Sequence, residues 1–75
     1  MEKQIKQLMA DIMDLPLNTI DENTSMDTVE GWDSFNHLNL CLALEQEFGI
    51  TLEVADMEGM TSFYDICQII QEKIS

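Results

Sequence analysis

A serine hydroxyl stands at the start of an apolar-periodic stretch, directly after a turn in the segment Gly-Trp-Asp-Ser-Phe at residues 31–35. Gly31 permits a tight turn, and a side-chain oxygen of Asp33 or Ser34 can accept a backbone N–H at the start of a helix. The Ser34 hydroxyl is then left exposed at a helix N-terminus. A presented hydroxyl on a small acidic body indicates a site that other proteins modify, rather than a group that performs chemistry itself.

The charge of the chain is strongly one-sided. Its 75 residues contain 3 Lys or Arg and 15 Asp or Glu, which gives a formal net charge of −12. No Lys or Arg occurs in residues 7–71. An acidic surface of this size repels phosphate backbones and anionic lipid headgroups, so we expect neither nucleic acid nor a membrane as a partner. Basic protein surfaces are the natural counterpart.

Length and composition predict one small domain covering residues 1–75. A chain of this length buries roughly 60% of its unfolded surface, which suffices for one core but not for a deep enclosed active site. Neither a signal peptide nor an apolar run of membrane-spanning length is evident. Cys41 and Cys67 lie in predicted helices without a C-x-x-C spacing, so we expect reduced thiols rather than a disulfide. A cytoplasmic location and a monomeric state are expected.

Helical periodicity dominates, and no convincing pair of strands is found. We predict an all-α fold, a small four-helix bundle with three main helices and one short third helix. The predicted ranges are 2–14, 34–48, 55–59 and 62–74. Leu15-Pro16 ends the first helix, Gly49 ends the second, and Thr61 or Ser62 caps the last.

Residues 17–33 form a long connection between the first two predicted helices. Its length exceeds that of usual loops, which itself suggests a functional role. Four apolar side chains are expected to pin it to the core: Leu17, Ile20, Met26 and Val29.

The predicted helix at 34–48 has two apolar stripes. On a helical wheel one sector of about 100° contains His37, Leu40, Cys41, Leu44 and Phe48. A second stripe, on nearly the opposite side, consists of Phe35, Leu38 and Leu42. Two interpretations remain open. Either the helix is wedged between neighbours and buries both stripes, or the wide sector faces the core and the second stripe is a docking surface beside Ser34.

Other polar residues have an ordinary structural role as their first interpretation. His37 follows Ser34 closely enough to suggest a base, but a lone helical histidine is more often a hydrogen-bonded residue at the edge of the core. Trp32 is expected to pack the connection onto the bundle, with partner contact as the alternative. The start of a calcium loop at residues 21–25 fails, because Met26 occupies the glycine position and Trp32 the glutamate position. We predict no metal site and no catalytic set.

The serine motif continues into a longer pattern that runs without a gap from Asp33 to Phe63. Its parts are Asp33-Ser34-Phe35, Leu40, Ala43-Leu44-Glu45, Glu47-Phe48-Gly49-Ile50 and, after an acidic short helix, Thr61-Ser62-Phe63. This pattern, together with the length and acidity of the chain, resembles the acyl carrier proteins. In that family Asp-Ser-Leu precedes a helix ending in Ala-Leu-Glu-x-Glu-Phe. The resemblance implies a four-helix carrier that is not an enzyme.

Carried over to this sequence, the resemblance implies that Ser34 bears 4′-phosphopantetheine in a phosphodiester. A phosphopantetheinyl transferase that uses coenzyme A and magnesium would attach it. The arm ends in a thiol, on which acyl groups travel as thioesters between active sites. Asp33 matches the family's aspartate that helps to position magnesium and the transferase. A helix N-terminus at Ser34 favours the phosphate through free N–H groups and the helix dipole.

The resemblance also assigns residues to partners and cargo. Acyl-loading and condensing enzymes with basic docking surfaces are the further implied partners. The residues implied to contact partners are Phe35, Leu38, Asn39, Leu42, Gln46 and Met57. In the family the acyl chain can fold back into the bundle, and the residues implied to line that interior are Leu40, Leu44, Phe48 and Met60.

Several positions depart from the best-known fatty-acid carriers. Phe35 replaces the usual leucine, and Asn39 and Gln46 occupy positions that are acidic in those carriers. Trp32 and His37 make the motif more similar to that of carriers dedicated to specialised pathways. The first hypothesis is therefore a carrier of acyl intermediates for fatty-acid, polyketide or related specialised biosynthesis. An aminoacyl or peptidyl carrier protein is one alternative, and a non-catalytic acidic interaction subunit with the same fold is the other.

Overall fold

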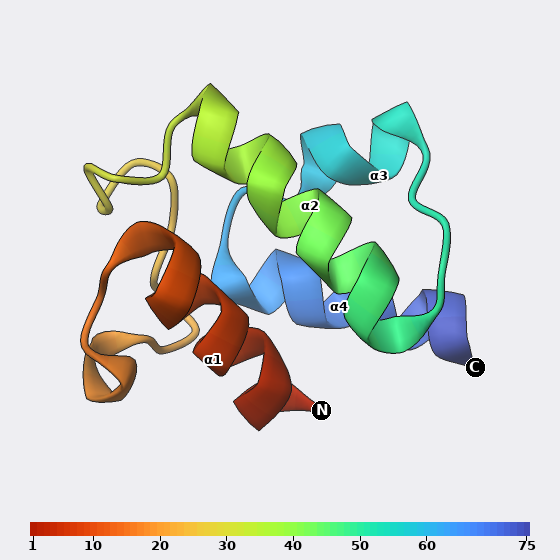
Figure 1. Ribbon diagram of the computed structural model, residues 1–75, viewed down its shortest axis with the longest axis horizontal. Helices are drawn as coiled ribbons and strands as arrows, with labels where there is room; N and C mark the ends of the chain where they lie inside the picture. The colour runs from red at the N-terminus through yellow and green to blue at the C-terminus, as the bar shows by residue number, and fades with distance from the viewer.

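Four α-helices and one short 3₁₀ turn make up the computed structural model, which describes residues 1–75 (Figure 1). The helices are α1 (Glu2–Met13), α2 (Ser34–Phe48), α3 (Val54–Gly59) and α4 (Phe63–Ile74). The predicted all-α fold with three main helices and a short third one is confirmed. None of the helices has the length and apolar character that crossing a bilayer requires.

The three long helices pack around a shared interior, and α3 closes one side. α1 packs on α2 and α4, and α3 packs on α4. Figure 1 shows the long connection between α1 and α2 gathered at one end of the molecule, next to the start of α2. The first residue of α2 therefore lies at the end of the bundle where the loop enters it.

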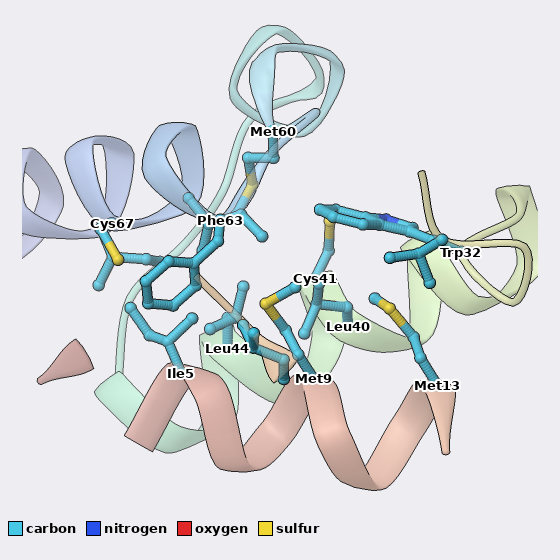
Figure 2. Packing of buried hydrophobic residues seen from close by; sticks show 14 of the residues in the cluster. Ile5, Met9, Met13, Trp32, Leu40, Cys41, Leu44, Met60, Phe63 and Cys67 are labelled. Atoms are coloured by element: carbon cyan, nitrogen blue, oxygen red, sulfur yellow. The ribbon is translucent and has the colours of Figure 1, made fainter. Parts of the chain in front are cut away.

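Apolar side chains from all three long helices meet in one core (Figure 2). Ile5, Met9 and Met13 follow each other at four-residue spacing along α1, so they lie on one face of that helix. The residues of α2 and α4 that face them are Leu40, Cys41, Leu44, Phe63, Ile66, Cys67 and Ile70. Each fully buried leucine, isoleucine or methionine removes an apolar side chain from water and stabilises the fold by roughly 1.5–3 kcal/mol.

Local signals at the helix ends explain where the elements begin and stop. Asp14 and Gly49, which follow α1 and α2, adopt left-handed conformations with φ of 55° and 63°, and their N–H groups bond back to the helix. The side chain of Ser62 accepts the Asp65 N–H at 3.1 Å at the start of α4, so Ser62 rather than Thr61 is the cap. α3 begins at Val54, one residue earlier than predicted.

The connection at 17–33 is more ordered than its sequence indicated. It opens with a 3₁₀ turn at Leu17–Thr19, which was not predicted. Ile20 and Val29 are buried and Met26 packs against the core, as expected. The expectation for Leu17 was wrong, because the turn that follows Pro16 leaves this side chain 40% exposed.

Backbone hydrogen bonds fasten this connection to the start of α4. The Met26 N–H donates to the Thr61 carbonyl at 3.0 Å, and the Phe63 N–H donates to the Thr24 carbonyl at 2.8 Å. Around residues 21–25, the Asp21 carboxylate accepts the Asn23 N–H at 2.8 Å, which is a local turn contact. The connection that leads to Ser34 is therefore bonded to the start of α4.

Both cysteines are unpaired and buried. Burial raises the pKa of the Cys41 thiol, and the nearby Glu45 carboxylate raises it further. Burial likewise raises the pKa of Cys67. Because the thiolate is the reactive form, both side chains behave as small apolar core residues.

Candidate functional site

Ser34 is the first residue of α2, and its side chain is exposed to solvent. Its hydroxyl makes no hydrogen bond within the protein, and the backbone N–H groups of Ser34 and Phe35 are also without a protein acceptor. Unpaired N–H groups at a helix N-terminus, together with the helix dipole, form a favourable environment for an anionic oxygen. The site thus combines an accessible hydroxyl with donors for a phosphate attached to it.

The cap of α2 is Asp33, which settles the choice between Asp33 and Ser34. The Asp33 backbone is extended, and its carboxylate accepts the Asn36 N–H at 2.9 Å. Because Asp33 takes the capping role, the hydroxyl of Ser34 remains free. One carboxylate oxygen is used by the cap, and the exposed side chain has further lone pairs available to a metal ion held by a partner.

The turn before Asp33 is held by a residue that the sequence did not single out. The side-chain amide of Asn36 donates to the Gly31 carbonyl at 2.7 Å. This hydrogen bond ties the first turn of α2 to the turn that precedes it. A Cβ at Gly31 would lie 3.3 Å from the Met13 carbonyl, which shows how closely this turn passes the end of α1. An amide side chain at the third helical position is the only local signal for this contact.

Trp32 and His37 have the structural roles expected of them. Trp32 is only 3% exposed and donates its indole N–H to Nδ1 of His37 at 2.9 Å. Nε2 of His37 lies 2.7 Å from the Met57 carbonyl oxygen. With both ring nitrogens engaged, His37 is a hydrogen-bonded residue at the edge of the core. Trp32 packs the connection onto the bundle.

One apolar stripe of α2 is buried and the other is exposed, so the interpretation in which the helix buries both was wrong. Leu40, Cys41 and Leu44 are completely buried. The other stripe remains at the surface, with exposures of 73% for Phe35, 51% for Leu38 and 54% for Leu42. We call these three residues the α2 stripe.

The first eleven residues of α2, which include the α2 stripe, carry no charged side chain. No charged residue occurs in α2 before Glu45, although the whole chain carries a formal charge of −12. Asn39 is partly buried and Gln46 is exposed. Met57 is partly buried and lies in an open groove of about 360 Å³, whose lining residues are Met26, His37, Val54, Met57 and Glu58. The exposed α2 residues that follow Ser34 are therefore apolar or uncharged as far as Gln46, apart from the partly buried Glu45, while the exposed carboxylates of Asp33 and Glu58 lie before and beside them.

The four residues expected to line an acyl pocket lie in the packed interior. Leu40, Leu44 and Met60 are fully buried, and Phe48 is partly buried against the core. None of the three surface grooves of the molecule is lined by these residues. Figure 2 shows Leu40, Leu44 and Met60 directed into a space filled by neighbouring side chains. An acyl chain can reach this interior only if these side chains or a helix move.

The donor chemistry of the site fits a phosphodiester better than a metal centre. No group of three or more His, Cys, Asp or Glu side chains is placed to hold a metal ion. At the start of α2, by contrast, one hydroxyl oxygen is free for an ester bond and two N–H groups are free for its phosphate. The residues present fit a covalently attached phosphate group.

Comparison with known proteins agrees with this chemistry. A family model described as a phosphopantetheine attachment site matches residues 3–70, which is most of the chain. The polyketide-8 synthase acyl carrier protein 2 of Streptomyces avermitilis is 25% identical over 73 residues, which cover 97% of this chain and 84% of that relative. The chain therefore belongs to the acyl carrier protein family, whose members are not enzymes and hold their cargo on covalently attached 4′-phosphopantetheine.

Proposed function

We propose that Ser34 carries 4′-phosphopantetheine and that this chain, folded as one domain over residues 1–75, carries acyl intermediates for a polyketide-type synthase. The observation that supports the attachment point most directly is the exposed, unbonded Ser34 hydroxyl at the capped start of α2. The polyketide assignment draws on the name of the Streptomyces relative. The neutral residues Asn39 and Gln46 on α2 favour it over a housekeeping fatty-acid carrier.

Each residue of the site has a defined task in this proposal. Ser34 provides the oxygen of the ester, and the N–H groups of Ser34 and Phe35 are available to the phosphate oxygens. Asp33 fixes the start of the helix and offers its remaining lone pairs to the magnesium ion of the transferase. When bound, the arm supplies a thiol that holds the acyl group as a thioester.

Partner enzymes dock on α2 in this proposal. They are the phosphopantetheinyl transferase and the acyl-loading and condensing enzymes of the synthase. The α2 stripe would provide the apolar centre of the contact, with Asn39, Gln46 and Met57 around it. Because α2 carries no charge before Glu45, basic residues of a partner would meet the acidic groups outside the stripe, such as Glu47 and Glu58.

The cargo would enter between α2 and α3. The open groove at Met57 lies on this side of the bundle, and His37, one of its lining residues, is three positions after Ser34 on the same helix. Residues three apart on a helix share a face. The buried side chains of Leu40, Leu44, Phe48 and Met60 are proposed to line the interior once a chain has displaced their present packing.

The attachment is tested by incubating the purified protein with coenzyme A, magnesium and a broad-specificity phosphopantetheinyl transferase, followed by intact mass measurement. We expect one phosphopantetheinyl increment in the wild type and none in Ser34→Ala. The Ser34 side chain is exposed and makes no hydrogen bond, so Ser34→Ala should melt within a few degrees of the wild type, as surface substitutions usually do. A folded wild type that gains no mass would contradict the proposal and favour an interaction subunit that carries no cargo.

A further inference from the structure

The single histidine of the chain joins three separate segments of the fold. Its ring belongs to α2, accepts the Trp32 indole N–H at 2.9 Å, and lies 2.7 Å from the Met57 carbonyl of α3. An indole N–H can only donate and a carbonyl can only accept. These two partners fit the tautomer whose proton is on Nε2 and points at Met57. We call this ring with its two hydrogen bonds the His37 bridge.

Within the His37 bridge, the bond to Met57 is the only side-chain hydrogen bond that ties α3 to α2. On its other side α3 is tied to α4, because Lys73 forms an ion pair with Asp56 at 2.8 Å. α3 has six residues, and none of them is fully buried. Separation of α3 from α2 therefore requires loss of the hydrogen bond from His37 to Met57.

The two ends of this hydrogen bond would not be affected equally by such a separation. The Met57 carbonyl also accepts the Met60 N–H at 3.3 Å, so it keeps a partner. The His37 Nε2–H has no second acceptor. Its other ring nitrogen stays bonded to Trp32, which is buried and holds the ring in place. Opening this side of the bundle thus exposes one oriented hydrogen-bond donor at the wall of the groove.

We propose that His37 determines cargo specificity by favouring acyl chains that carry a carbonyl oxygen over saturated chains. This inference rests on the proposed attachment of the arm at Ser34, one helical turn away. A chain that enters the groove replaces Met57 as the neighbour of Nε2. An oxoacyl oxygen accepts the freed N–H, whereas a saturated chain leaves that partly buried donor without a partner. The Nε2–H therefore selects for oxygenated cargo.

The test compares two cargoes that differ only at one carbon, hexanoyl and 3-oxohexanoyl. Both are loaded from their coenzyme A thioesters by the transferase, and intact mass confirms that each sits on the protein before any further measurement. A failed loading would count against the attachment at Ser34, whereas successful loading isolates the role of His37. The readout is the ¹⁵N chemical shift of the His37 ring and of the backbone amides of residues 54–60.

We expect 3-oxohexanoyl to shift the His37 Nε2 and the α3 amides, with an occupancy of the groove roughly fivefold or more above that of hexanoyl. In His37→Phe, which keeps a ring but has no donor, the two cargoes should perturb α3 equally. In His37→Gln, whose side-chain amide can donate, the preference should largely return. Trp32→Phe removes the donor to Nδ1 that orients the ring, so the preference for 3-oxohexanoyl should weaken in this variant as well.

Three results would overturn the inference. The first is equal perturbation of α3 by the two cargoes in the wild type. The second is the absence of perturbation by either cargo. The third is a preference for 3-oxohexanoyl that persists in His37→Phe. Thermal melting of each variant confirms that the comparison is made between folded proteins.

Discussion

Replacement of Asp33 separates its observed role as the cap of α2 from its proposed role in assisting the transferase. Its carboxylate accepts the Asn36 N–H at 2.9 Å, and loss of such a cap typically costs about 1 kcal/mol. For a chain of this length a loss of 1 kcal/mol lowers Tm by about 4–8 °C. We expect Asp33→Ala to show this decrease. Asp33→Asn keeps an accepting oxygen and loses only the interaction of its charge with the helix dipole, about 0.3–1 kcal/mol at low salt.

The stability of each variant is measured by thermal and denaturant unfolding, at low and at high salt. Because salt screens the interaction between the charge and the dipole, Asp33→Asn should approach the wild type at high salt, while Asp33→Ala should not. The same proteins are then assayed for the rate of phosphopantetheinyl transfer. We expect both variants to be slow, because neither an alanine nor a neutral amide replaces a carboxylate that faces a magnesium ion.

Ser62→Ala is the matched control for this experiment. Ser62 caps α4 through its hydroxyl, which accepts the Asp65 N–H at 3.1 Å, so its loss should also lower stability by about 1 kcal/mol. Its transfer rate should equal that of the wild type. The reasoning is refuted if Asp33→Ala melts like the wild type, if Asp33→Asn is modified at the wild-type rate, or if Ser62→Ala is modified as slowly as Asp33→Ala.

Two further predictions concern the α2 stripe and the ion pair of α3. Leu42→Glu, at a 54% exposed position, should change the free energy of unfolding by less than about 0.5 kcal/mol yet slow the transferase. Leu44→Ala in the core should lower the free energy of unfolding by about 2–5 kcal/mol. Equal losses in the two variants would place Leu42 in the core. The hydrogen bond from Lys73 lowers the pKa of Asp56 below its usual 3.8, and the same bond raises the pKa of Lys73 above 10.5. A depressed carboxyl pKa contributes stability that is lost as pH falls through the folded value, and a raised amine pKa contributes stability that is lost as pH rises through it. The Tm difference between the wild type and Lys73→Gln should therefore be constant near neutral pH and shrink below about pH 4 and above about pH 10. A Tm difference that does not change with pH would exclude the ion pair as its source.

Features encoded by neighbouring residues were predictable from the sequence. The bounds of α2 were predicted correctly because Asp33 caps the start and Gly49 adopts φ of 63° at the end, and both signals are local. The α2 stripe also follows from periodicity, although periodicity alone left open whether Leu38 and Leu42 would be covered. Their exposure depends on where α3 and α4 pack, which is a property of the whole fold.

Features that depend on distant residues were not predictable. The long connection is held by bonds to Thr61 and Phe63, far along the chain, and nothing in its own composition specifies those partners. The hydrogen bond from His37 to Met57 spans 20 residues and was missed for the same reason. Leu17 was wrongly assigned to the core because its apolar character does not reveal which way a 3₁₀ turn faces.

The burial of both cysteines has a consequence for any thioester that this protein holds. A thioester passes readily to another thiolate, so an accessible cysteine on the carrier would compete with the arm for its own cargo. Cys41 and Cys67 are buried, and burial raises the pKa of both thiols, so neither presents a thiolate to the solvent. The terminal sulfur of the arm would then be the single reactive thiol of the molecule, and the cargo would not pass to another site on the same carrier.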